Sequence, residues 1–164
     1  MEIVNKQAVS AFPRAMIAVF EESGFTGLRI DDLAARLPDA TPVFEVSVSV
    51  GVAGQLKGYM FLQASLEVAT SVAREISRLM GIELDRPNEF GQMHRAALAE
   101  LANQVSGRAM MYLSEMGIDA DITPPTVLTG TQVSMAVADG LQFHDTALHG
   151  DAGDLNLVVG LLPG

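Results

Sequence analysis

Residues 89–117 read EFGQMHRAALAELANQVSGRAMMYLSEMG, and they have the apolar spacing of one long helix. Apolar residues recur there at intervals of three and four, which places them on a single face at about 100° per residue. They are Leu98, Leu101, Ala102, Val105, Ala109, Tyr112, Leu113 and Met116. We therefore expect an amphipathic helix over 89–117 whose apolar face packs on a core.

The opposite face of this helix carries a carboxylate and a carboxamide, Glu100 and Asn103. They are three residues apart, so their side chains are neighbours on the helix surface. Small residues surround them, namely Ala96, Ala99 and Gly107. A solvated helix face usually carries Lys and Glu, and this bare face therefore indicates close approach by another surface. Taken alone, Glu-x-x-Asn is a weak signal, and an ordinary solvated face is the plain alternative.

The chain before this helix predicts two further helices near its start. The first is expected over 6–23 and is ended by Gly24. Pro13 conflicts with a helix interior and fits a first turn, so a start near Phe12 is the alternative. A second, short helix is expected over 30–37, with an aspartate near its N-terminus. Two helices with a glycine-containing link also suggest a helix-turn-helix, although the acidic charge opposes this and packing against a sheet is preferred.

A hairpin and a helix come next. Valines alternate with Ser and Gly over 43–52, which is typical of a half-buried strand, and a second strand is expected over 56–63 after a turn at 53–55. Residues 65–80 then have helical apolar spacing, with Ser65 as the N-cap and Gly81 as the end.

The last third of the chain predicts strands. The pair Pro124-Pro125 favours an extended backbone. A short strand is expected over 126–129, a turn or bulge over 130–134, and an extension or partner strand over 133–137. A hairpin follows over 141–149 and 154–162. Two strand groups thus bracket a helical pair, so we expect one domain over 1–164, built as two similar halves sharing a sheet. The fold class is α/β of the α+β type, with an antiparallel-rich sheet on two long central helices.

Composition limits the possible functions. Apolar residues make up 49% of the 164 positions and charged residues 18%, which predicts a sizeable core rather than disorder. The net charge is −10, and ten scattered Lys and Arg residues do not supply a surface for nucleic acid or an anionic membrane. There is no cysteine, no apparent signal peptide and no apolar run long enough to span a bilayer. A cytoplasmic protein is expected.

The histidines give no strong metal signal. His144 and His149 are five apart in an expected strand, so they point to opposite faces unless a bulge intervenes. We therefore expect no metal site there. His94 precedes the apolar stripe of the long helix and is expected to be partly buried.

Around Glu100, Asn103 and the proline pair, the sequence resembles the CheC/CheX/FliY group of chemotaxis phosphatases, and CheX most closely. The resemblance rests on AELANQVSGRA at 99–109, followed by PPTV at 124–127 and Gly130. The group's signature is Asp or Ser, three residues, Glu, two residues, Asn, and a later proline. Glu100, Asn103 and the proline pair fit it, and Ala96 stands where the group has Asp or Ser. The signature occurs once, so a two-site CheC arrangement is not supported.

The resemblance implies a CheC-like fold and a phosphatase, a hydrolase that acts on the phosphoaspartate of a CheY-like response-regulator receiver in two-component signalling. Asn103 would orient the attacking water, Glu100 would pair with the receiver's lysine, and Ala96, Ala99 and Gly107 would contact the receiver. No cofactor is expected in the chain itself, since Mg²⁺ is carried by the receiver. A homodimer is also implied, and the apolar strand 155–162 is expected to be the edge strand that forms it.

Two alternatives stay open at this point. One is a receiver-binding or flagellar-switch-type module of the same fold, in which Ala96 reflects lost catalysis. The other is a structural domain in which Glu100 and Asn103 have no function, as a buried Asn103 would indicate.

Overall fold

The computed structural model describes residues 2–35, 44–133 and 140–162. Its elements run in the order α1 (Glu2–Ser23), β1 (Arg29–Ile30), β2 (Ala34–Ala35), β3 (Phe44–Gly54), β4 (Gly58–Ala64), α2 (Leu66–Leu79), α3 (Gln92–Glu115), β5 (Ala120–Ile122), β6 (Thr126–Val133), β7 (Gln142–Gly150) and β8 (Gly153–Leu161). Helices and antiparallel strands are mixed, which confirms the predicted class.

One antiparallel sheet organises the molecule. Its strand order is β1-β7-β8-β4-β3-β5, while β2 also pairs with β7 and β6 also pairs with β3. The two predicted hairpins are both present, β3 with β4 and β7 with β8. Strands β4 and β8 pair at the centre, so the two strand groups share one sheet as expected.

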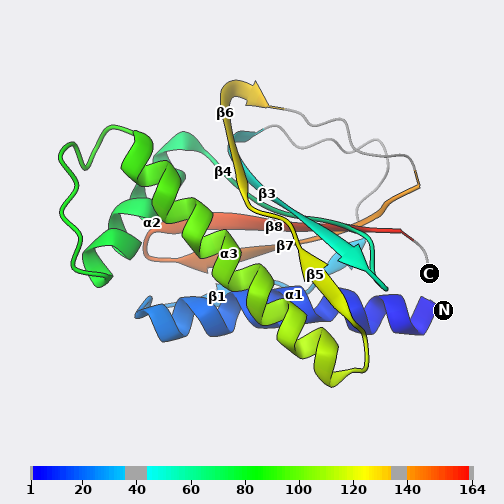
Figure 1. The fold of residues 1–164 in the computed structure, drawn as a ribbon. Coiled ribbons are helices and arrows are strands. Elements are labelled where there is room, and N and C mark those ends of the chain that lie inside the picture. Colours follow the sequence, from blue (N-terminus) through cyan, green and yellow to red (C-terminus); the bar gives the residue numbers. More distant parts are fainter. Residues whose placement is uncertain (1, 36–43, 134–139, 163–164) are drawn as a thin grey trace.

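The helices cover one face of this sheet, and α1 and α3 lie side by side across it (Figure 1). Alternate residues of the central strands point to this face, including Val48 and Val50 of β3 and Leu157 and Val159 of β8, each at most 2% exposed. Helix α3 contributes the facing side of the core through Leu101, Val105 and Leu113, which are at most 1% exposed. The apolar stripe of the long helix is thus buried as predicted, except that Tyr112 is half-buried and Met116 at its end is exposed.

Helix α1 begins well before Pro13, so the alternative in which this proline marks the first turn does not hold. Pro13 lies inside the helix, which runs from Glu2. A proline in a helix interior costs about 3 kcal/mol, whereas each large apolar side chain that is fully buried contributes about 1.5–3 kcal/mol. Val9, Phe12, Met16 and Phe20 are all at most 2% exposed. Burial on both sides of Pro13 therefore outweighs the local penalty. The helix predicted over 6–23 is present and begins four residues earlier, whereas the alternative start near Phe12 was wrong.

The second expected helix is absent from its described part. Residues 30–35 contribute instead to two short strands on the sheet edge, where Ile30 pairs with Leu148 and Ala34 with Asp145. The helix-turn-helix alternative required this second helix, so it was wrong as well. Residues 36 and 37 of that expected helix lie outside the described residues.

The remaining helices agree with the sequence prediction, whereas the strand after the proline pair is longer than expected. Helices α2 and α3 lie within their predicted ranges of 65–80 and 89–117, and Ser65 is the N-cap of α2 as expected. Strand β6 continues through the expected turn, with a register shift between the pairs Phe44–Val133 and Val46–Thr129. The further extension over 134–137 lies outside the described residues. No helix within the described ranges is long and apolar enough to cross a membrane.

Strand β8 is not an edge strand. It lies between β7 and β4, and both of its sides are hydrogen-bonded. The prediction that 155–162 forms a dimer by edge pairing was therefore wrong. Leu155, Leu157, Val158 and Val159 are at most 4% exposed. Residues 157–161 are all buried, so this part of the central strand is covered on both faces. A short apolar run is also typical of such a buried strand.

Candidate functional site

Helix α3 carries the site, and its start is held by a histidine. Gly91 is the N-cap, and its backbone N–H donates to His94 Nδ1 at 3.2 Å. His94 Nε2 lies 2.9 Å from the carbonyl oxygen of Pro87. A neutral imidazole protonated on Nε2 satisfies both bonds. His94 is 2% exposed, more buried than expected, and it fixes where α3 begins.

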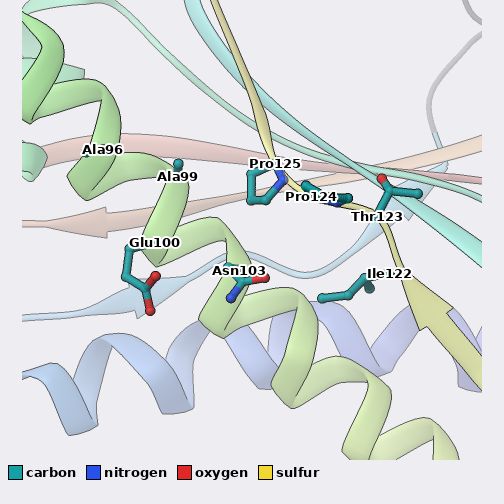
Figure 2. Close-up of a pocket in the computed structure, with 8 residues that line it drawn as sticks. All are labelled: Ala96, Ala99, Glu100, Asn103, Ile122, Thr123, Pro124 and Pro125. Atoms are coloured by element: carbon teal, nitrogen blue, oxygen red, sulfur yellow. The ribbon is translucent and has the colours of Figure 1, made fainter.

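Glu100 and Asn103 project from the solvent side of α3, one turn apart (Figure 2). Both side chains are exposed, while Leu101 and Ala102 between them are buried. The Nε2 amide of Gln104 donates to Glu100 Oε1 at 3.3 Å. Since Asn103 is exposed, the alternative in which it is buried within the core is excluded.

An open cleft of about 510 Å³ adjoins the pair. Its α3 wall is made of Ala96, Ala99, Glu100 and Asn103. The opposite wall consists of Ile122 at the end of β5 and of Thr123, Pro124 and Pro125, which lead into β6 (Figure 2). Methyl groups and proline rings thus border one carboxylate and one carboxamide. The eight lining residues include no histidine, lysine or cysteine, so the cleft itself supplies neither a strong nucleophile nor a cation.

The far wall is fixed to the sheet by two hydrogen bonds. The N–H of Thr123 donates to the carbonyl oxygen of Gly51 at 2.9 Å, and the N–H of Gly51 donates to Thr123 Oγ1 at 2.8 Å. The preceding loop is held in the same way, since the Gln55 N–H donates to the Asp119 carbonyl and the Asp119 N–H donates to Gln55 Oε1. The prolines therefore have a defined position relative to α3.

An arginine beside the cleft connects α3 to β6. Arg95 Nη2 donates to Thr129 Oγ1 at 2.6 Å, and Nη1 donates to the Val127 carbonyl at 3.4 Å. Its guanidinium also lies 5.8 Å from the centre of the Phe90 ring. Arg95 thus joins the first turns of α3 to β6, the strand that follows the proline pair.

Four of the predicted site residues and the proline pair meet in the cleft. Gly107, which was predicted as a contact residue, is half-buried one turn beyond Asn103 and does not line it. A Cβ atom at Gly107 would meet nothing within 4 Å. Ile122 and Thr123 were not predicted as site residues, and neither was Arg95. The one signal in the sequence was position: Ile122 and Thr123 directly precede the proline pair, and Arg95 directly precedes Ala96.

The histidines near the chain's end are arranged as the strand spacing predicts. His144 pairs with Val159 and His149 with Asp154 in a regular register, so the two side chains lie on opposite faces. His149 Nδ1 lies 2.7 Å from Asp154 Oδ1, and Nε2 lies 2.9 Å from Asp31 Oδ2. The carboxylates are on opposite sides of the ring, and no His, Asp or Glu group in the described parts is arranged to hold a metal.

Comparison with known proteins assigns the fold and the family. The CheX-CheY-BeF3-Mg²⁺ complex from Borrelia burgdorferi contains a chain that matches with TM-score 0.75 and 22% identity, over 94% of this chain and 97% of that chain. CheX from Desulfovibrio desulfuricans matches with TM-score 0.81 and 19% identity, over 94% and 99% of the two chains. Both likenesses show the fold, and they confirm the CheC-like architecture expected from the sequence.

Sequence comparison gives the family. The Thermotoga maritima protein named CheY-P phosphatase CheX is 32% identical over 87 residues, which is 52% of this chain and 52% of that protein. The chain therefore matches about half the length of this curated relative. The family model described as chemotaxis phosphatase CheX matches residues 46–148, which include most of β3 and β7, all of β4 and both walls of the cleft. The chain belongs to the CheX family of chemotaxis phosphatases.

Proposed function

We propose that this protein hydrolyses the phosphoaspartate of a CheY-like receiver domain, with Asn103 and Glu100 as the residues that act on it. One observation carries the proposal: in a CheX-family chain, an exposed carboxylate and carboxamide lie one turn apart on a rigid helix beside an open cleft. An open cleft with apolar walls suits a protrusion from another protein better than a small molecule, which usually occupies an enclosed pocket.

The reaction needs little from this chain beyond positioning. A water oxygen forms a bond to phosphorus, the bond from phosphorus to the aspartate oxygen breaks, and phosphate leaves with the water's protons. The receiver brings its own Mg²⁺ and lysine to the phosphoryl group, so this chain needs no cofactor of its own. Asn103 has both donors and an acceptor on its carboxamide and holds the water in line with the leaving oxygen.

Glu100 has a separate part in the proposal. As an exposed carboxylate it accepts from the ammonium group of the receiver lysine, which fixes the approach of the two proteins. Holding reactants in line is worth several kcal/mol of barrier. Ala96 and Ala99 leave room for the receiver backbone on the same wall. Gly107, one turn away, stays a predicted contact, because the space above it is open.

The setting follows from the same proposal. A receiver is a cytoplasmic signalling domain, so we place this protein in the cytoplasm. The homodimer expected from the resemblance remains a prediction. Strand β8 is interior, so a dimer formed by strand pairing would use another strand, such as those at the β1/β2 or β5/β6 edges.

The test follows phosphate release from phosphorylated receivers of the same genome, with wild type, Asn103→Ala and the control Met111→Ala. Met111 is on α3, is 59% exposed and does not line the cleft. We expect wild type and control to accelerate release and Asn103→Ala to lose about 10²-fold while still binding a beryllofluoride-loaded receiver. Binding without acceleration by wild type would support the non-catalytic alternative, which the alanine at position 96 favours. Equal rates for wild type and Asn103→Ala would remove the assigned role.

A further inference from the structure

A second hollow lies beside the cleft, between the end of α2, the loop that follows it and the first turns of α3. Its volume is about 200 Å³. Its walls are mainly apolar side chains, from Met80 and Ile82 after α2, Leu84 in the loop and Met93 in α3. We call it the Met93 hollow.

The side chains of this hollow are exposed to an extent that is unusual for their type. Met80 is 53% exposed, Ile82 44% and Met93 41%. Single exposed apolar residues are ordinary on a protein surface, whereas several that border one hollow mark a surface for another molecule.

The hollow adjoins the cleft. Ala96 and Glu100 line both of them, so the two depressions are separated only by one alanine and one glutamate on the same helix. A protein that covers Asn103 and contacts Glu100 therefore borders the Met93 hollow as well. This shared border identifies the occupant: the partner that reaches Asn103 is also the partner placed to fill the hollow.

The loop that forms the hollow is held at both ends. The Ile82 N–H donates to the Ser77 carbonyl at 2.8 Å, directly after α2. At the other end, His94 contacts the Pro87 carbonyl, and Arg74 Nη1 donates to Asn88 Oδ1. The hollow is thus formed before a partner arrives, and filling it orders few additional side chains.

We propose that the Met93 hollow receives an apolar side chain of the receiver, from its surface beside the phosphorylated aspartate. This inference rests on the proposed function, since the receiver is the partner that it names. Glu100 places a carboxylate at the border of the hollow, so the inserted side chain is flanked by a basic residue. Asn103 then serves the chemical step, whereas the hollow serves recognition.

The test separates recognition from chemistry with conservative variants. Met93→Gln and Ile82→Ser remove apolar contact without adding charge, Met93→Leu keeps it, and Met111→Gln is the matched control on the same helix. We expect Met93→Gln and Ile82→Ser each to raise KM for the phosphorylated receiver about tenfold, as loss of one buried apolar contact predicts. The kcat should stay unchanged. Met93→Leu and Met111→Gln should keep the wild-type KM, and thermal unfolding should show that all variants are folded.

Failure of this inference is distinguishable from failure of the proposed function. If wild type accelerates release but the hollow variants keep its KM, the hollow is not a receiver site and the function stands. If wild type binds a beryllofluoride-loaded receiver without accelerating release, the function fails, and the same variants test the hollow by their Kd. If wild type neither binds nor accelerates, both fail. A variant that converts a dimer to a monomer would assign the hollow to a second copy of this chain and overturn the inference.

Discussion

The hydroxyl oxygen of Thr123 lies 2.8 Å from the backbone nitrogen of Gly51, and this contact fixes the proline wall of the cleft to strand β3. It requires a glycine. A Cβ atom at position 51 would lie 2.8 Å from Thr123 Oγ1 and 3.1 Å from its Cγ2. The missing side chain therefore lets the hydroxyl reach the backbone, and Pro124 follows directly in the chain.

Gly51→Ala should reduce receiver dephosphorylation by about tenfold or more, because displacement of a positioning element by a fraction of an ångström to 1 Å is enough for such losses. The added methyl group must push Thr123 away, and Pro124 and Pro125 move with it. Phosphate release by the folded variant is the measurement. The control is Thr123→Ser, which keeps the hydroxyl and should keep the activity. Full activity in Gly51→Ala would mean that the position of the proline wall does not matter.

Arg95→Met should lower the free energy of unfolding by about 1.5–3 kcal/mol, the usual worth of hydrogen bonds to a charged group. Methionine keeps an apolar stem on α3 but cannot donate to Thr129 or to the Val127 carbonyl. Urea unfolding measures the change.

The matched control for Arg95 is Arg86→Met. Arg86 forms an ion pair with Glu89 at 3.3 Å, and the two side chains are 80% and 70% exposed. Exposed pairs contribute about 0–1 kcal/mol, so this variant should be nearly as stable as wild type. Equal losses for the two variants would show that Arg95 is no more than a surface charge.

The α3 wall of the site was predictable from the sequence, and its opposite wall was not. Glu100 and Asn103 share a face because of helical periodicity, which is a local property. Thr123 reaches the site only because it pairs with Gly51, 72 residues earlier in the chain. A contact between residues so far apart in the chain cannot be predicted from local sequence patterns. The proline pair was identified by its chemistry and its family match, without a geometric argument for its place.

Errors in the predicted fold arose where distant contacts outweigh local preference. Strand β1 has two residues, too few for an alternating pattern, and it exists because Ile30 and Arg29 pair with β7. Pro13 stays in a helix because of the core around it. Strand β8 has the apolar run expected of a buried strand, but its position between β7 and β4 depends on the order of the whole sheet.

Glu100→Gln should raise KM for the phosphorylated receiver several-fold and weaken its dependence on salt. The substitution keeps the size of the side chain and removes the charge proposed to pair with the receiver lysine. Because exposed charges are screened within about 8–10 Å at ordinary ionic strength, the wild-type KM should rise with added NaCl and the variant's much less. Glu115→Gln, also exposed and at the far end of α3, is the control. Parallel salt curves for all three proteins would contradict the pairing.

His149→Asn should destabilise the protein more at pH 6 than at pH 9. The hydrogen bonds of His149 to Asp31 and Asp154 raise its pKa above the usual value of 6.5. A neutral imidazole has one N–H and can donate to one carboxylate only, so both contacts need the charged ring. A raised folded-state pKa gives stability that is complete below about 6.5 and is lost as pH rises through the raised value.

His144 provides the internal contrast, because burial lowers its pKa. NMR titration of the ring protons should therefore place the midpoint of His149 above that of His144. Urea unfolding of wild type and His149→Asn between pH 5.5 and 9 should show a stability difference that shrinks with rising pH. A constant difference would mean that His149 stabilises the β1–β7–β8 edge as a neutral side chain. In that case Asp31, which follows β1, would not be held to the sheet by charge.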